Sequence, residues 1–298
     1  MECMKECRIC PRSCAKNRLA GETGFCGETN QIRIARAALH FWEEPFISGE
    51  KGSGAIFFTG CNLKCIYCQN AEIALSAHGK EVSVRELSDI MLDLQTQGAH
   101  NINLVTPSHV VPQVCEALLL AREKGLALPV VYNTSAYESV ETLRLLDGLV
   151  DIYLPDYKYR DGELAAKYSH APDYPEIAGK AIAEMFRQRG PLKLGEDGML
   201  QSGVVVRHLL LPLGVRNAKA VLDELRETYG DAIFISIMNQ FTPVRRIEEY
   251  PHLNRKVTKR EYENVLSYIL EKGMENVFFQ EGETAKESFI PDFHQFGE

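Results

Sequence analysis

Three cysteines stand close together in the run Cys61-Asn62-Leu63-Lys64-Cys65-Ile66-Tyr67-Cys68. They follow residues 55–60, a short, continuous apolar segment that is rich in aromatic residues and typical of a buried strand. The cysteines therefore lie on the loop that leaves the carboxyl end of a strand. This C-x3-C-x2-C loop constrains the fold most strongly, because the chain must bring three thiols to one point there.

The spacing of these thiols favours an iron–sulfur cluster. Thiolates are the usual ligands of such clusters, and close spacing lets one loop hold several corners. Three thiolates leave one iron of a four-iron cluster open to a substrate or cofactor. The alternatives are three buried thiols or a zinc site, but structural zinc takes four ligands, and no Cys or His lies close downstream. We therefore predict an iron–sulfur site at Cys61, Cys65 and Cys68, with the ring of Tyr67 beside it.

A second set of cysteines lies near the N-terminus, where Cys7, Cys10, Cys14 and Cys26 form a C-x2-C-x3-C-x11-C array. Residues 1–30 contain few apolar side chains, so a metal would supply the core that this segment lacks. Four cysteines suit either tetrahedral zinc or a fully ligated auxiliary cluster. The close spacing of the first three slightly favours the cluster. Free surface thiols are the third possibility, and Cys3 could replace one of the four.

Strand-like and helix-like segments alternate from residue 54 onward, which predicts parallel βα units. We expect six strands and a short last one, at residues 55–60, 102–105, 129–133, 150–154, 203–211, 232–238 and 277–280. Ser83, Ser135 and Thr258 each precede a Glu by three residues and predict helix starts, as does Asn217. Residues 156–175 are expected to form a loop over the barrel mouth.

The expected fold is thus α/β, a partial (β/α)6 barrel of the triosephosphate-isomerase type with a small Cys-rich, metal-binding N-terminal lobe. Residues 1–52 would form the lobe and linker, and residues 53–298 the barrel. Active sites of such barrels lie at the carboxyl ends of the strands. The cysteine loop and other polar segments follow strand ends and should converge there, namely residues 106–109, 133–135, 156–158, 207–208 and 239–240.

Charge and composition limit the class of protein. The net charge of −8 provides no overall basic field that would attract nucleic acid. The N-terminus lacks the pattern of a signal peptide, and no apolar run reaches the roughly 18 residues that a membrane span needs. Nine cysteines without an export signal indicate a reducing cytoplasm. Trp42 is expected to pack the lobe on the barrel; alternatively, Glu43 or Glu44 faces the substrate.

The cysteine loop, with an aromatic residue before its last cysteine, resembles the radical S-adenosylmethionine superfamily. Residues 57–70 resemble the glycyl-radical-enzyme activating enzymes, above all the pyruvate formate-lyase-activating-enzyme-like iron–sulfur proteins. Residues 10–14, 42–45, 133–138 and 151–158 match the same branch. The resemblance implies an oxygen-sensitive 4Fe-4S cluster on Cys61, Cys65 and Cys68. It also implies an anaerobic oxidoreductase that cleaves S-adenosylmethionine to a 5′-deoxyadenosyl radical, which abstracts hydrogen from a substrate.

The resemblance also implies roles for individual residues. Tyr67 would lie by the adenine. Thr106 or Ser108 would replace the Gly-Gly-Glu turn that holds the methionine amino group in relatives. Asp156 would hold a monovalent cation, with Asn133 standing where those relatives have Asp. Lys158 would be a catalytic residue that neutralises charge at the cofactor. Arg207 is expected, from its own position after an apolar run, to be catalytic and to bind the cofactor carboxylate, because a guanidinium is a bidentate donor.

Partners and rival functions follow from the same resemblance. An electron donor such as flavodoxin or ferredoxin would reduce the cluster, and the target would be a backbone glycine of a glycyl radical enzyme. The alternatives are a radical enzyme that modifies a small metabolite, a peptide or an RNA, and a non-catalytic iron–sulfur electron carrier. No membrane partner is expected.

Overall fold

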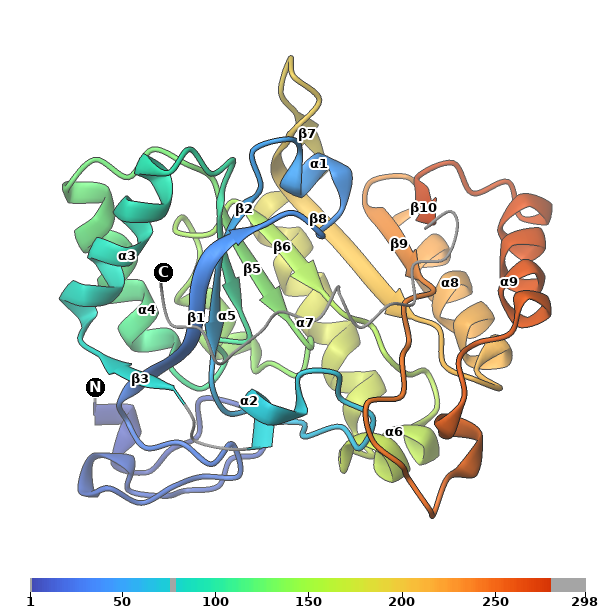
Figure 1. Cartoon of the computed structure of the whole chain (residues 1–298), viewed down its shortest axis with the longest axis horizontal. Helices are drawn as coiled ribbons and strands as arrows, with labels where there is room; N and C mark the ends of the chain where they lie inside the picture. The colour runs from blue at the N-terminus through green and yellow to red at the C-terminus, as the bar shows by residue number, and fades with distance from the viewer. Residues whose placement is uncertain (1, 76–78, 280–298) are drawn as a thin grey trace.

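The computed structural model describes residues 2–75 and 79–279, and a sheet of mainly parallel strands runs through it (Figure 1). Its order is β10-β9-β8-β6-β5-β4-β2-β1-β3. The strands from β10 to β2 are parallel to their neighbours. They are β2 (Ser53–Phe58), β4 (Ile102–Val105), β5 (Val130–Thr134), β6 (Ile152–Pro155), β8 (Leu200–Leu209), β9 (Phe234–Met238) and β10 (Val277–Phe279). The predicted alternation is confirmed, although Gln280 lies outside the described residues.

Two antiparallel strands extend the sheet beyond β2. Strand β1 (Ile32–His40) pairs with β2, and β3 (Lys80–Val82) pairs with β1. At the other side, β7 (Lys193–Leu194) forms a small antiparallel pair with β8. Because the order runs from β10 to β3 without a pairing between those two, the sheet is curved but not closed. The α/β fold with an open, mostly parallel sheet is thus confirmed.

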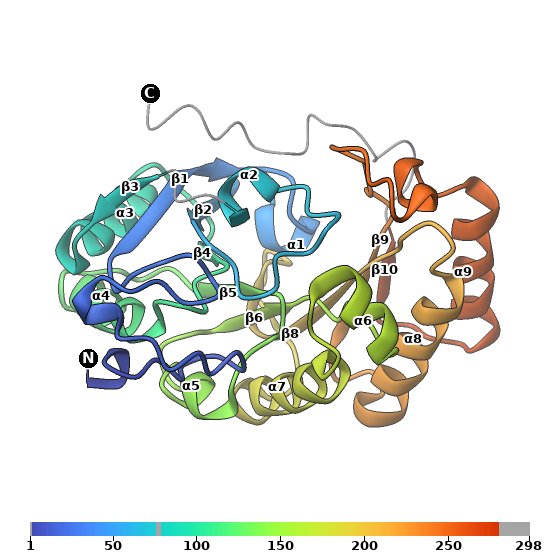
Figure 2. The same ribbon diagram turned by 90° about the horizontal axis from the view of Figure 1, so that it is seen from below.

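Helices connect the strands and cover the outer face of the sheet, where α3, α4, α7, α8 and α9 lie in Figure 2. The helices are α1 (Pro45–Ser48), α2 (Ala71–Leu75), α3 (Val84–Thr96), α4 (Val111–Glu123), α5 (Val140–Arg144), α6 (Gly162–Ser169), α7 (Tyr174–Arg189), α8 (Val215–Tyr229) and α9 (Lys259–Glu271). In the described part of the chain, none of them combines the length and the apolar character that a membrane crossing demands.

Two of the predicted helix starts are confirmed and two are wrong. Ser83 and Thr258 each form a capping box with the Glu three residues later. Ser135 does not begin a helix, because Glu138 is buried and accepts hydrogen bonds from three hydroxyl groups; the helix starts at Val140 instead. Asn217 lies inside α8, and its amide instead donates to the carbonyl of Lys158 at 2.9 Å.

The segment 156–175, predicted as a loop, contains helix α6. The carboxylate of Asp161 accepts hydrogen bonds from the backbone amides of Glu163 and Leu164 and so caps the start of this helix. The helix ends at Ser169, directly against the cysteine loop. This segment therefore forms a wall of the barrel mouth.

The N-terminal segment consists mainly of turns and docks on the barrel through Arg12. The Arg12 Nε donates to the carbonyl of Asn62 at 2.7 Å, and its Nη atoms donate to the carbonyls of Ser169 and His170. The Arg12 guanidinium also stacks over the ring of Phe25 at 3.9 Å. Trp42 was expected to make this contact, but its side chain is 56% exposed. An arginine therefore attaches the segment to the cysteine loop and to α6.

Candidate active site

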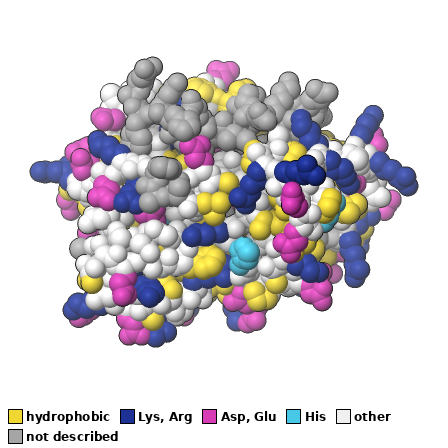
Figure 3. Space-filling view, turned by 60° about the horizontal axis from the view of Figure 1, so that its bottom comes forward, with side chains coloured by type: hydrophobic (Ala, Val, Ile, Leu, Met, Phe, Trp, Pro, Cys, Tyr) yellow, Lys and Arg dark blue, Asp and Glu magenta, His cyan; other side chains and the backbone are white. Residues whose placement is uncertain are grey.

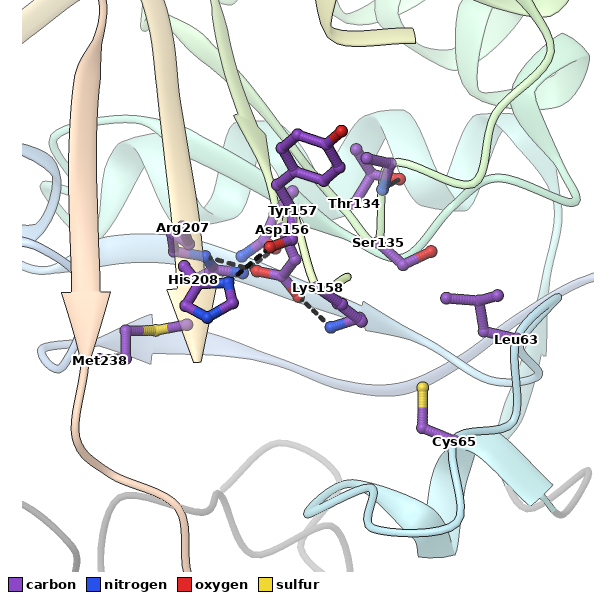
Figure 4. Close-up of polar contacts among 12 residues, drawn as sticks. Leu63, Cys65, Thr134, Ser135, Asp156, Tyr157, Lys158, Arg207, His208 and Met238 are labelled. Carbon is purple, nitrogen blue, oxygen red and sulfur yellow. Dashed lines mark hydrogen bonds and ion pairs between the residues drawn. The ribbon is translucent and has the colours of Figure 1, made fainter. Parts of the chain in front are cut away.

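A cavity of about 240 Å³ lies at the carboxyl ends of the parallel strands (Figure 4). The cysteine loop forms one wall, and the residues at the ends of β4, β5, β6 and β8 form another. Almost all side chains predicted for the barrel site line it, namely Cys61, Cys65, Tyr67, Cys68, Thr106, Asn133, Asp156, Lys158 and Arg207. Glu43, Trp42 and His40 line it as well. The convergence inferred from strand ends is therefore real.

Local backbone geometry folds the cysteine loop into tight turns. Gly60 has φ +76°, and a Cβ on it would lie 2.5 Å from Cγ of Glu28, so the loop needs glycine there. Lys64 is also left-handed, with φ +53°. The amide of Leu63 points at Sγ of Cys61 at 3.4 Å, and the amide of Cys68 donates to the carbonyl of Cys65 at 3.1 Å. These turns present all three sulfur atoms to one cavity.

The donor set fits a metal cluster. Burial raises the pKa of the Cys65 thiol and raises the pKa of Cys68 to about 12. Both thiols would therefore keep their protons at neutral pH, whereas a metal binds thiolates and releases those protons. The positive charge of Lys158 acts in the opposite direction to burial and lowers the pKa of Cys65. The loop thus offers three sulfur ligands, and the nearby Lys158 can balance part of their negative charge.

A chain of buried hydroxyl groups leads to Cys65. The Ser169 Oγ lies 3.0 Å from Sγ of Cys65. The hydroxyl of Tyr159 lies 2.8 Å from that of Ser169 and 2.7 Å from that of Tyr67. The Ser169 hydroxyl donates to Cys65 and the Tyr159 hydroxyl donates to Tyr67, so the three hydroxyl groups form one connected buried network, and hydrogen bonds in such networks strengthen one another. No local sequence pattern indicates Ser169 or Tyr159, which reach this loop only through the fold.

Arg207 is the centre of a buried ionic network, whose contacts to Asp156 are drawn in Figure 4. Its Nε donates to Asp156 at 2.9 Å, its Nη1 to Glu43 at 3.0 Å and its Nη2 to Asn133 at 2.6 Å. Lys158 Nζ lies 2.6 Å from the other carboxylate oxygen of Asp156. Burial alone would raise the pKa of Asp156, but the two cations hold it below the usual value.

This network changes the role expected for Arg207. All three of its nitrogens donate to groups of the protein itself, so it holds Glu43, Asn133 and Asp156 in place. The resemblance implies a monovalent cation beside Asp156. In the structure, the guanidinium of Arg207 places a positive charge beside Asp156 and Asn133. Glu43 also accepts hydrogen bonds from Asn103 and Asn133 at 3.1 and 3.3 Å. The sequence singled out Glu43 only as one of two acidic residues after Trp42.

Ser108, expected among the cofactor contacts, does not line the cavity. Its hydroxyl donates to the buried carboxylate of Glu138, because the chain after β4 turns into the core at this point. Its neighbour His109 is buried, and neither ring nitrogen has a hydrogen-bond partner within the described ranges. Burial, together with the nearby Arg18, lowers the pKa of His109 to about 3. His109 is therefore a neutral core residue.

His109 should make the protein less stable in acid. A histidine in the unfolded chain takes up a proton near pH 6.5, roughly its ordinary pKa, whereas folded His109 does so only near 3. Between these values the unfolded state binds more protons, so the free energy of unfolding falls as the pH falls. Between about pH 7 and about pH 5, we expect the free energy of unfolding of His109→Leu to fall by about 2 kcal/mol less than that of the wild type. Urea unfolding at both pH values measures this, and an unchanged loss would contradict it.

Comparison with known proteins supports this description of the site. Residues 47–162 match the family model of the 4Fe-4S single cluster domain. The uncharacterized protein MJ0674 of Methanocaldococcus jannaschii is 28% identical over 270 residues, which cover 88% of this chain and 73% of that protein. MJ1227 of the same organism, whose name assigns it provisionally to the glycyl-radical enzyme activating enzymes, is 31% identical over 134 residues. That match covers 45% of this chain and 54% of MJ1227.

Solved structures share the fold at low identity. Native anSMEcpe with bound AdoMet gives a TM-score of 0.53 at 12% identity, over 74% of this chain and 61% of that chain. A radical SAM methyltransferase from Sphaerobacter thermophilus gives 0.51 at 15% identity, over 76% of this chain and 67% of that chain. The cysteine loop at the end of β2 lies inside the matched cluster domain. The chain therefore carries a match to the 4Fe-4S single cluster domain over residues 47–162 and shares its fold with solved radical S-adenosylmethionine enzymes.

Proposed function

We propose that this chain cleaves S-adenosylmethionine reductively and abstracts hydrogen from a backbone glycine of a partner protein. One observation carries the proposal: the three thiols of the cysteine loop share a single cavity with the cations Lys158 and Arg207. When bound, the cluster and S-adenosylmethionine supply the 5′-deoxyadenosyl radical, which is chemistry that no side chain of the protein provides. The protein contributes binding, orientation and shielding.

The residues of the cavity divide these tasks. Cys61, Cys65 and Cys68 would hold the cluster. Asp156 fixes the Lys158 ammonium at the cavity wall, where it neutralises a carboxylate of the cofactor. Arg207 is a positioning residue for Asp156 and Asn133 in this proposal.

The ring of Tyr67 and the hydroxyl of Thr106 border the same space and bind the rest of the cofactor. Tyr67 is held edge-on by Tyr168 and Phe241, with ring centroids 6.2 Å away in both cases. Its orientation is therefore fixed before any ligand binds, which reduces the entropic cost of binding.

A protein substrate fits the surface better than a nucleic acid. Acidic and basic side chains are interspersed over the described part of the face shown in Figure 3, and the net charge of the chain is −8. Nucleic acid binding needs clustered Lys and Arg. The partial likeness to MJ1227 supports a glycyl radical enzyme as the partner. A low-potential one-electron donor, such as flavodoxin or ferredoxin, completes the proposed system.

Two measurements test the proposal. Anaerobically reconstituted protein, reduced with dithionite and given S-adenosylmethionine, should form 5′-deoxyadenosine and methionine. Adding a glycyl radical enzyme from the same organism should then give the electron paramagnetic resonance signal of a glycyl radical. Absence of 5′-deoxyadenosine would overturn the proposal. Formation of 5′-deoxyadenosine without a glycyl radical on any such partner would instead assign the enzyme another substrate, such as a metabolite or a peptide.

The buried hydroxyl groups of Ser169 and Tyr159 should affect the reduction potential of the cluster. Hydrogen bonds to the ligand sulfurs help to set the reduction potential, because they stabilise the more negative reduced state. Ser169→Ala removes the donor at Cys65, so we expect a shift of the reduction potential to more negative values, with a smaller shift for Tyr159→Phe. A redox titration followed by electron paramagnetic resonance measures both. Ser88→Ala, at a buried serine in α3, is the matched control and should leave the potential unchanged. Equal potentials in Ser169→Ala and the wild type would contradict this role.

A further inference from the structure

Four cysteines converge in the N-terminal segment, outside the cavity. Cys7, Cys10 and Cys26 are buried and Cys14 is half-buried. A Cβ placed on Gly24 would lie 2.9 Å from Sγ of Cys14 and 3.6 Å from Sγ of Cys26, so both sulfurs face the same small space and the glycine keeps it open. Burial is the main cause of the raised pKa of Cys10, about 12, and the nearby Cys26 and Cys7 contribute to that value. All four sulfurs therefore belong to one cluster of side chains.

A buried cation faces this cluster. Arg18 has no exposed surface, and its Nη1 points at Sγ of Cys7 at 3.6 Å. Its other contacts are the carbonyl oxygens of Thr29 and His109, the latter at 2.6 Å. Among residues 2–75 and 79–279, Arg18 has no carboxylate oxygen within 4.0 Å, and the buried Glu28 feels its charge only from farther away. Burying a charge is costly unless anions balance it, and metal-bound sulfur at Cys7 would add an anion in direct contact with Arg18.

The cysteine set lies directly against the cysteine loop of the barrel. The amide of Cys61 donates to the carbonyl of Cys26 at 3.3 Å, so one backbone hydrogen bond joins a residue of each set. The same carbonyl would lie 2.9 Å from a Cβ on Gly60. Arg12 adds a second connection by donating to the carbonyl of Asn62 at 2.7 Å. A metal centre in the N-terminal segment would therefore be an immediate neighbour of the barrel cluster.

We infer that Cys7, Cys10, Cys14 and Cys26 hold a second iron–sulfur cluster beside the first one. Tetrahedral zinc, with bonds of about 2.3 Å, would draw the sulfurs to about 3.8 Å from one another. Cys7, Cys10 and Cys14 stand within eight residues, a close thiolate spacing that is typical of cluster-binding segments. A cubane cluster takes one thiolate at each corner and accepts a wider spacing. This inference rests on the proposed function, because it assumes that Cys61, Cys65 and Cys68 hold the first cluster.

Metal content and magnetic coupling test the inference. Anaerobically reconstituted protein should hold about eight irons per chain and no zinc. Cys10→Ser/Cys26→Ser should reduce this to about four irons, while the exposed Cys3→Ser and the helical Cys115→Ser should keep the full content. In the reduced wild type, the electron paramagnetic resonance signal should be broadened by coupling between the two clusters, and the broadening should vanish in Cys10→Ser/Cys26→Ser.

A second variant keeps the test valid if the double variant fails to fold. Arg18→Gln retains every cysteine, so the iron content should stay the same, and the potential of the N-terminal cluster should become more negative because a neighbouring positive charge is lost. About four irons plus one zinc, or about four irons alone, would overturn the inference. Two uncoupled signals would also overturn it. A protein with about eight irons that does not cleave S-adenosylmethionine would contradict the proposed function and leave this inference standing.

Discussion

Replacing Cys61, Cys65 and Cys68 together by alanine is expected to abolish the cleavage of S-adenosylmethionine. These three thiols are the only cysteines among the described residues that line the cavity. Without them no cluster can form there, and no side chain can supply the electron that splits the sulfonium. We expect no 5′-deoxyadenosine above background, compared with multiple turnovers for the wild type. The variant should also lose the irons of the barrel site while it keeps those of the N-terminal segment.

The assay needs a control for the effect of removing cysteines as such. Cys115 is half-buried in α4 and lies outside both cysteine sets, so Cys115→Ala should retain cleavage. Product formation by the triple variant at the wild-type rate would show that the cluster is bound elsewhere, and the assignment of the barrel site would then be wrong.

Arg207→Met is expected to destabilise the protein by about 3–5 kcal/mol and to weaken the binding of S-adenosylmethionine. The substitution leaves the carboxylates of Glu43 and Asp156 buried without their common cation, which is the costly way to break a buried ion pair. Binding weakens because Asp156 loses one of the two cations that hold it in place. Urea unfolding and equilibrium binding to the reconstituted protein measure the two effects separately.

Two further variants identify the cause. Adding Glu43→Gln to Arg207→Met removes one unpaired charge, so the double variant should regain part of the lost stability, which is a non-additive result for residues in contact. Lys180→Met, at an exposed lysine that pairs with the exposed Glu176, should cost less than about 1 kcal/mol. Asp156→Asn should weaken binding with a smaller loss of stability than Arg207→Met. Unchanged binding in both Asp156→Asn and Arg207→Met would show that the network serves folding alone.

Local patterns were sufficient for much of this fold. The strand–helix alternation follows from short apolar runs and from apolar residues repeated at helical spacing, and the parallel strands β2, β4, β5, β6, β8, β9 and β10 lie close to the expected residues. The short antiparallel strands β3 and β7 were not among the expected strands. The capping boxes at Ser83 and Thr258 depend on groups three residues apart, so the sequence contains all of the information. The cysteine loop is equally local, and its three thiols can be singled out from their spacing alone.

The same kind of pattern was misleading where burial decided the outcome. Ser135 and Glu138 have the spacing of a capping box, but the carboxylate lies in the core and accepts hydrogen bonds from Ser108, Tyr132 and Thr134. A sequence pattern does not say which side of the chain will face the core. Tertiary packing therefore overruled the local preference at this turn, and the helix begins later, at Val140.

The sequence by itself determined which segments form strands, where the cluster loop lies and which strand ends meet at the mouth. Only the tertiary structure decided how the charges there are paired. Arg207 and Glu43 are 164 residues apart in the chain, and Ser169 and Cys65 are 104 residues apart, yet each pair is in contact. Such contacts depend on the order of the strands in the sheet and on how the sheet curves and the connecting segments pack against it. Neither property is encoded within a window of a few residues, because both result from the packing of the whole chain.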